Sequence, residues 1–206
     1  GYKGHLAVTP ERIVVAATMA SGEKGDGPEL PELIRKAKEN IPDLEEVVGD
    51  GAYSGQDNLE CAEREGVELV AKLHPIVAGG TRENDGFSFN KDAGMMVCPA
   101  GHMAVKKVHC KVTEKNKNER FVYHFNIIKC RKCKHAASCG YKKGQNTKTY
   151  TVTMRTEQQE RQLERQKSEE FRQKYGIRYI IEAKNSELKH SYHLDKAISY
   201  GLDAYT

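Results

Sequence analysis

The chain changes character at Pro75. Before this residue, apolar runs alternate with loops in a pattern typical of buried strands and amphipathic helices. From Pro75 to Thr149, by contrast, Gly, Asn, Lys and Cys are abundant and the apolar runs are short. A polar segment of this kind has few large apolar residues with which to build a core. We therefore interpret 75–149 as an insertion into a core domain formed by 1–74 and 150–206.

The core domain is predicted to be α/β, with a mixed sheet. Residues 12–20 form a nearly continuous apolar run, which is typical of a buried strand. The segment 155–173 is intensely polar and predicts a helix that crosses solvent or faces a partner. The predicted strands are 3–9, 12–20, 45–50 and 67–73, and the predicted helices are one ending near 40, 56–65, 155–173, and a closing helix that begins near Tyr175.

The net charge of +4 hides a strong asymmetry. Between His102 and Lys148 there are 13 Lys and Arg but only two acidic residues, whereas the other 159 residues carry 20 basic and 27 acidic side chains. A basic segment in an otherwise acidic chain favours a polyanionic partner, most commonly nucleic acid; a solubilising loop region is the alternative. The longest apolar stretch, at 13–20, is far too short to span a bilayer, so no membrane partner is expected.

Four of the six cysteines predict a metal site. Cys130, Cys133 and Cys139 follow a C-x2-C-x5-C spacing, and Cys98 stands earlier in CPAGH. In a cytosolic protein such clustering indicates metal rather than disulfides, and four thiolates suit structural Zn²⁺. An iron–sulfur cluster and unligated thiols are the alternatives. Residues that could replace Cys98 as a ligand are His102, His135 and Cys110.

A second pattern lies near the C-terminal end. Tyr175, Arg178, Glu182 and Lys189 are spaced by three, four and seven residues, which places them within an arc of roughly 60° on one helix. Arg and Lys can bind phosphate, and a Glu oxygen can bind a hard divalent cation. The alternative is an ordinary pair between Arg178 and Glu182 on a solvated helix.

The spacing resembles the Y-(2)-R-(3)-E-(6)-K signature of DDE transposases from bacterial insertion sequences. The segments GYKGHLAV and VVGDGAYSG and the cysteine-bearing insertion also resemble one branch of that family. The resemblance implies a ribonuclease H-like fold in which two Asp and one Glu hold two divalent metals, Mg²⁺ or Mn²⁺. It makes Asp50 the second acidic residue and Glu182 the third, with Tyr175, Arg178 and Lys189 as their signature partners.

Asp50 also stands at the carboxyl end of a predicted strand, where open α/β sheets place ligands. Its alternative role is to stabilise the following turn. In the family the first Asp precedes the segment that begins here at Gly1, and nothing in this chain corresponds to it. We therefore expect the chain to be part of a larger protein, inactive alone, and to lack its first, central strand between 3–9 and 45–50.

The resemblance implies DNA cleavage and strand transfer at insertion-sequence ends, in the bacterial cytoplasm. The expected partners are double-stranded DNA, from transposon ends and target, and a second copy of the chain. Two other functions fit the residues. One is a non-catalytic, zinc-stapled module that binds nucleic acid, and the other is a different ribonuclease H-like nuclease.

Overall fold

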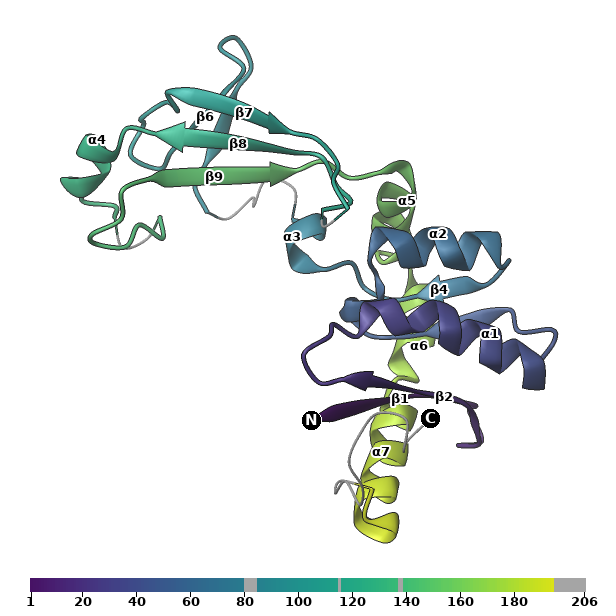
Figure 1. Cartoon of the computed structure of the whole chain (residues 1–206). Coiled ribbons are helices and arrows are strands. Elements are labelled where there is room, and N and C mark those ends of the chain that lie inside the picture. The colour runs from purple at the N-terminus through teal and green to yellow at the C-terminus, as the bar shows by residue number, and fades with distance from the viewer. Residues whose placement is uncertain (80–84, 115, 137–138, 195–206) are drawn as a thin grey trace. The chain divides into compact units, whose positions relative to one another are not determined.

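The computed structural model describes residues 1–79, 85–114, 116–136 and 139–194 (Figure 1). The chain divides into two units. Unit 1 comprises 1–74 and 158–206, and unit 2 comprises 75–157. The boundary at 149/150 drawn from the sequence falls inside strand β9 (Lys148–Thr153), whereas unit 2 ends at Glu157. Each unit has its own buried residues and is described by itself.

Unit 1 begins with an antiparallel hairpin of β1 (Tyr2–Val8) and β2 (Val14–Ser21), as the apolar runs predict. Alternate residues of β2 are buried, and Ala16 packs against Leu33 and Ala37 of α1 (Leu30–Asn40). A short 3-10 turn, η1 (Gly27–Glu29), leads into this helix. One face of the hairpin is therefore covered by α1, because the strand and helix periodicities bring their apolar residues together.

A second, separate sheet pairs β3 (Glu46–Val48) with β4 (Glu68–Val70) in parallel. The 3-10 turn η2 (Gly51–Tyr53) and helix α2 (Gln56–Arg64) make the crossover between them. The described residues are mixed α/β, as predicted, but their strands form four small sheets instead of one mixed sheet. β1 pairs only with β2, and β3 only with β4, so no backbone ladder joins the hairpin to the parallel pair.

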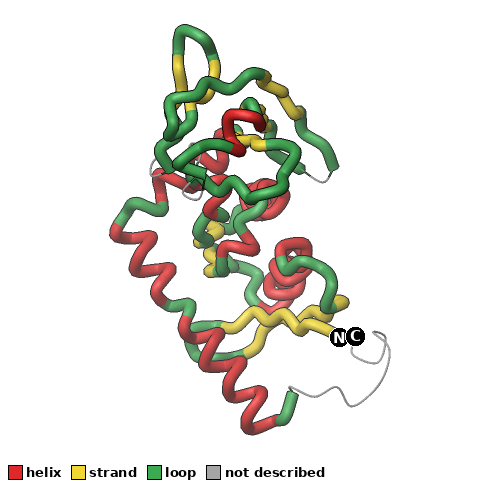
Figure 2. The backbone as a smooth tube through the Cα atoms, turned by 90° about the vertical axis from the view of Figure 1, so that its left-hand side faces the viewer, coloured by secondary structure: helices red, strands yellow, loops and turns green. Residues whose placement is uncertain are grey.

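Three helices follow in the C-terminal part of unit 1: α5 (Glu157–Arg165), α6 (Glu169–Gly176) and α7 (Tyr179–Tyr192). Figure 2, in which helices are red and loops are green, shows successive helical segments joined by short loops. The prediction of one continuous helix over 155–173 is wrong, because Ser168 starts a new helix. Its hydroxyl accepts a hydrogen bond from the Phe171 amide at 3.1 Å, which is a typical N-cap.

Helix α5 buries polar side chains instead of crossing solvent. Gln159 and Gln162 are only 1% and 3% exposed. The Gln162 amide nitrogen donates to the carbonyl oxygens of Leu69 and Ala71, at 3.0 and 2.8 Å. One of these carbonyls lies in β4 and the other directly follows it, so one side-chain amide satisfies acceptors that a neighbouring strand would otherwise bind. The polarity of this helix thus reflects a hydrogen-bonding role toward the sheet.

Lys174 of α6 fastens the helices to both strands of the parallel pair. Glu46 and Glu68 lie directly opposite each other in the ladder, and like charges in this position repel. The Lys174 ammonium lies 2.8 Å from a carboxylate oxygen of each, and 3.0 Å from Glu170. Arg165 of α5 also pairs with Glu68. Two facing carboxylates on β3 and β4 thereby become the attachment point for α6.

Unit 2 contains the hairpin β5 (Ser88–Asn90) and β6 (Met95–Val97), and a three-stranded antiparallel sheet of β7 (Lys106–Cys110), β8 (Arg120–Phe125) and β9. Two short helices, α3 (Pro75–Ala78) and α4 (Ile127–Arg131), complete it. No helix in the residues described here is long and apolar enough to cross a membrane.

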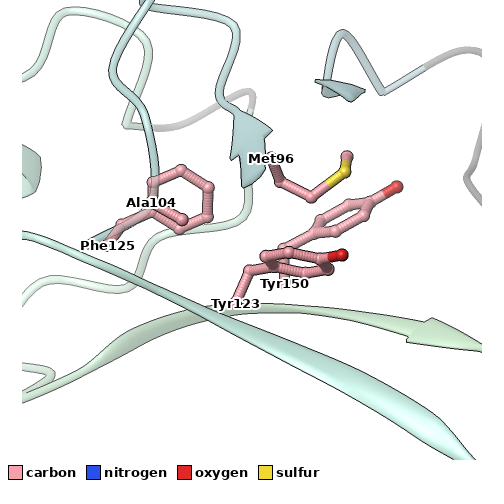
Figure 3. Packing of buried hydrophobic residues seen from close by; sticks show 5 residues of the cluster. All are labelled: Met96, Ala104, Tyr123, Phe125 and Tyr150. Carbon is pink, nitrogen blue, oxygen red and sulfur yellow. The ribbon is translucent and has the colours of Figure 1, made fainter. Parts of the chain in front are cut away.

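The core of unit 2 is small and aromatic. Figure 3 shows the Met96 side chain directed toward the rings of Tyr123 and Tyr150, with Phe125 beside Ala104. The ring of Phe87 stacks on Tyr150 with 4.2 Å between centroids. Five buried residues form this cluster, so few apolar contacts hold the rest of unit 2 together.

We predict that Lys174→Met lowers the stability of unit 1 in a pH-dependent way. Burial by itself would raise the pKa of Glu68, but hydrogen bonds and charges from Lys174 and Arg165 hold it below its usual value. A lowered carboxyl pKa stabilises the fold above the unfolded-state pKa, about 4.3, and this contribution disappears as the pH falls through the folded pKa. The urea midpoint of the variant should therefore lie below that of the wild type at pH 7 and approach it near pH 3.

The control is Lys167→Met, which removes an ion pair with Glu164 whose two side chains are both well exposed. Exposed pairs of this kind contribute little. An equal pH-dependent loss in both variants would show that Lys174 has no special role.

Candidate functional site

Arg178 joins two of the signature residues directly. Its guanidinium donates one hydrogen bond to the Tyr175 hydroxyl and another to a Glu182 carboxylate oxygen, each at 2.8 Å. The hydrogen bonds that Arg178 donates, first of all the one to Glu182 and next the one to Tyr175, raise the pKa of Arg178 above its ordinary value. The Glu182 side chain is 66% exposed, and one carboxylate oxygen has no bond to Arg178. The three side chains form a continuous network open to solvent.

The helix that carries this network is not continuous. Tyr175 belongs to the last turn of α6, and Arg178 precedes α7. Short-range bonds join the two helices: the Arg178 amide donates to the Tyr175 carbonyl, and the Ile181 amide to the Arg178 carbonyl, both at 3.3 Å. The expectation of one helix beginning near Tyr175 is therefore corrected, since Gly176 is a poor helix residue and the backbone tightens there.

Lys189 lies apart from this network. Its side chain is exposed in the last turn of α7 and makes no hydrogen bond or ion pair with the described part of the chain. Seven residues of α-helix separate it from Glu182 by about 10 Å along the axis. Sharing a helix face is thus not enough to bring Lys189 into contact with Glu182.

Asp50 follows β3 and begins the η2 turn. One carboxylate oxygen accepts a hydrogen bond from the Ala52 amide at 2.8 Å, and the side chain is otherwise exposed. The turn is tightly packed: a Cβ on Gly51 would lie 3.2 Å from the Lys72 carbonyl oxygen, and one on Gly27 would lie 2.9 Å from that of Ala52. Asp50 therefore does stabilise its turn, and its exposed side chain remains free to bind a ligand.

Sequence reasoning missed the residues that support this turn. The Asn58 amide, nearly fully buried, donates to the carbonyl oxygens of Gly27 and Tyr53 at 2.8 and 3.0 Å. The Tyr53 hydroxyl lies 3.0 Å from Nδ1 of His5, whose Nε2 is buried without a partner in the described structure. Burial first, and then the charges of Asp50, Asp26 and Glu29, raise the pKa of Tyr53 to about 12. Strand alternation, which turns His5 inward, is the one signal that could have revealed this contact.

Lys72, just beyond β4, links the surroundings of the two carboxylates. Its carbonyl lies against Gly51, next to Asp50. Its ammonium lies 4.6 Å from the centre of the Tyr175 ring, and Tyr175 is bonded through Arg178 to Glu182. No sequence motif indicates a role for Lys72, because its position beside Tyr175 depends on the packing of α6 against β4.

The carboxylates do not form a ready-made metal site. Among the residues that the structure describes, no group of three or more His, Cys, Asp and Glu side chains is arranged to hold a metal ion. No hydrogen bond or ion pair joins Asp50 to Glu182 there either. Their assignment as metal ligands stays a prediction.

The four predicted cysteines of unit 2 meet at one cavity of about 20 Å³. Cys98 reaches it from the end of β6, Cys130 from α4, and Cys133 and Cys139 from the loop that follows. His102 and His135 also line the cavity, whereas Cys110 does not. Burial, and then the neighbouring thiols, raise the pKa of Cys130.

This gathering of thiols falls short of the predicted zinc site. The side chains line one cavity. In the described part of the chain, however, they are not arranged as a group of three or more ligands that could hold a metal ion.

Residues 97–206 match the family model of the transposase DDE domain. The match covers more than half of the chain, so the protein belongs to this family. It includes the cysteine cluster and the network of Tyr175, Arg178 and Glu182 but begins after Asp50. Membership implies a transposase enzyme family, a ribonuclease H-like fold and DNA as a partner. Searches of curated proteins and of solved structures found no match.

We predict that Tyr53→Phe alters the stability of unit 1 chiefly at alkaline pH. A phenol whose folded pKa is about 12 keeps its proton after the unfolded chain has lost it near pH 10. The wild type should then lose stability between pH 10 and 12, and the variant should lose less over the same range. Urea unfolding at pH 8, 10 and 11.5 measures this difference.

Tyr179→Phe, which removes an exposed hydroxyl from α7, is the matched control. Equal alkaline losses in the wild type and in the Tyr53 variant would mean that the Tyr53 hydroxyl is not protected in the folded protein.

Proposed function

We propose that this chain contributes to DNA cleavage and strand transfer at the ends of a bacterial insertion sequence. The observation that carries the proposal is the hydrogen-bonded set of Tyr175, Arg178 and Glu182, which lies inside the matched transposase DDE domain. Arg178 holds one carboxylate oxygen of Glu182 and leaves the other directed to solvent, where it can act as a ligand.

Two carboxylates that we propose as ligands suit a hard divalent cation. Asp50 and Glu182 are both exposed carboxylates, and oxygen ligands are what Mg²⁺ and Mn²⁺ prefer. We propose these two residues as metal ligands, and the family's use of Mg²⁺ supports this assignment. A pair of such ions, when bound, activates water or a 3′-hydroxyl and stabilises the leaving oxygen of a phosphodiester.

The other side chains of the site would orient these carboxylates and the DNA. Arg178 fixes the rotamer of Glu182, and the Tyr175 hydroxyl accepts the second arm of the same guanidinium. Lys72 connects this network to the turn that carries Asp50, which supports a common site. Lys189 is an exposed cation that can contact a DNA phosphate farther along α7.

The cysteine cluster is proposed to hold a structural zinc ion. Four thiols converge on one cavity in a unit whose core contains few residues, and closure around Zn²⁺ would stabilise it. Four thiols are a donor set that fits Zn²⁺ in its chemistry. Zinc would here serve folding and take no part in cleavage.

A second candidate function is a nucleic-acid-binding module without catalysis, favoured by the basic charge of unit 2. A plain nuclease on the same fold is a third. Transfer of a cut 3′ end into target DNA separates a transposase from both. Assembly as a homodimer on DNA and a location at the bacterial nucleoid belong to the same proposal.

Replacement of Glu182 by Gln is expected to reduce cleavage by at least about a hundredfold, because the amide keeps the shape but removes a charged ligand. Cleavage of DNA carrying the element's ends should be assayed with Mg²⁺, in the longest natural chain that contains this sequence. DNA binding and the melting temperature should stay near wild-type values.

The matched control is Glu169→Gln, which neutralises an exposed carboxylate of α6. Cleavage retained by the Glu182 variant would exclude Glu182 as a metal ligand. Cleavage lost equally in the control would indicate a general effect of charge.

Metal analysis of the purified protein tests the cysteine proposal. About one zinc per chain is expected, and Cys133→Ser should remove it and lower the melting temperature. Cys110→Ser, at a cysteine outside the cavity, should leave zinc bound. Iron in place of zinc would indicate an iron–sulfur cluster, and neither metal would end the proposal.

A further inference from the structure

The two units carry opposite net charges. Residues 75–157 contain 16 Lys and Arg against six Asp and Glu, whereas the rest of the chain contains 17 against 23. Within unit 2 the charge is concentrated further. Residues 120–156 contain nine Lys and Arg and no acidic residue at all. A segment with no carboxylate of its own cannot neutralise its cations locally, so its potential extends into solvent.

Most of these cations gather where the cysteines do. We define the cysteine knuckle as residues 126–136 and 139–148, which contribute Cys130, Cys133, His135, Cys139 and Lys148 to the lining of the thiol cavity. Its exposed cations are Lys129, Arg131, Lys132, Lys134, Lys142 and Lys143. None of the six has an ion pair among the residues described. The seventh cation, Lys148, is half-buried, lines the cavity and donates to the Cys139 carbonyl oxygen.

Short backbone turns hold the exposed cations in place. The Asn126 side chain caps α4, accepting from the Ile128 amide at 3.0 Å. The Cys133 amide then bonds to the Cys130 carbonyl at 3.2 Å, and the Cys139 amide to the His135 carbonyl at 3.0 Å. The cysteine side chains line the cavity while the lysines between them are exposed, so one short segment has a sulfur-lined inside and a cationic outside.

Among polyanions, a nucleic-acid backbone fits this surface best. Its phosphates are closely and regularly spaced, and lysines bind them as point charges without reading the bases. A protein interface usually adds large apolar anchors at its centre. In the described knuckle the one exposed large apolar side chain is Ile128.

We propose that the cysteine knuckle is a contact surface for the phosphate backbone of duplex DNA. The proposal rests on the proposed function for its partner, and it adds the part of the chain that contacts this partner. The thiol cluster then has a purpose beyond stability, because it holds mutually repelling cations on a short segment. The acidic carboxylates of unit 1 and the cationic knuckle of unit 2 divide metal binding and DNA binding between the units.

The test is a variant in which Lys132, Lys134, Lys142 and Lys143 are all replaced by Gln. Its affinity for a 30-base-pair duplex should be measured at several salt concentrations, by fluorescence anisotropy on the longest natural chain. The slope of log K against log salt is negative, and each lost phosphate contact reduces its magnitude by about 0.9. Loss of four contacts is therefore expected to reduce the magnitude by about 3 to 4. At 0.1 M salt the affinity should fall at least tenfold.

The control removes the same charge from unit 1, by Gln at the exposed residues Lys24, Arg35, Arg64 and Arg172. Equal losses in both variants, or no loss in the knuckle variant, would overturn the proposal. If the knuckle binds polyglutamate but does not bind duplex DNA, the proposal is also overturned, because this result would indicate an acidic protein partner. Zinc content and circular dichroism of the knuckle variant establish that it is folded.

The two proposals fail in different ways. If the knuckle variant binds DNA normally while Glu182→Gln abolishes cleavage, the surface is wrong and the proposed function stands. If the knuckle variant loses DNA affinity and the wild type cleaves no DNA under any metal condition, the surface stands as part of a binding module.

Discussion

The short parallel sheet of unit 1 depends on a cation, Lys174, that lies between two facing carboxylates. β3 and β4 pair over only three residues each, and they place Glu46 directly opposite Glu68. Without a counter-charge this pairing would be repulsive. Lys174 supplies that charge from α6, and Tyr175 is the next residue in the chain. The interaction that stabilises the short sheet therefore also sets where the network of Tyr175, Arg178 and Glu182 begins.

Tyr175 makes one contact through its ring and another through its hydroxyl. Its ring lies beneath the Lys72 ammonium, and the backbone of Lys72 packs against the turn of Asp50. Its hydroxyl accepts from Arg178, which holds Glu182. A chain of contacts thus runs from one exposed carboxylate to the other through side chains in unit 1. Buried amides complete the support, with Gln162 fastening α5 to β4 and Asn58 joining η1 to η2.

Unit 2 is organised on another principle. Its aromatic cluster is small, and the segment between Phe125 and Tyr150, which follows the cluster directly in sequence, relies on short turns and a sulfur-lined cavity. The same segment holds a high density of positive charge with no acidic residue to offset it. Repulsion among these cations and the scarcity of apolar contacts both favour a bound counterpart, a metal inside and a polyanion outside.

Local patterns were sufficient for much of this protein. The hairpin, α1, α2 and the strand before Asp50 follow from apolar periodicity and turn residues, which act over a few neighbours. The four cysteines singled out in the sequence line one cavity, whereas their role as metal ligands stays a prediction. The signature spacing brought out Tyr175, Arg178 and Glu182, because residues three and four apart on a helix are neighbours even across the tightened turn at Arg178.

Packing between distant segments settled the rest. The role of Lys72, the burial of Gln162, the support of Tyr53 by His5, and the division of the core into separate sheets all involve residues far apart in the chain. Lys189 shows that a shared helical face does not imply contact, since it lies on the same face as Glu182 but two turns away. Such contacts depend on how whole elements meet, and no spacing rule within one segment encodes that geometry.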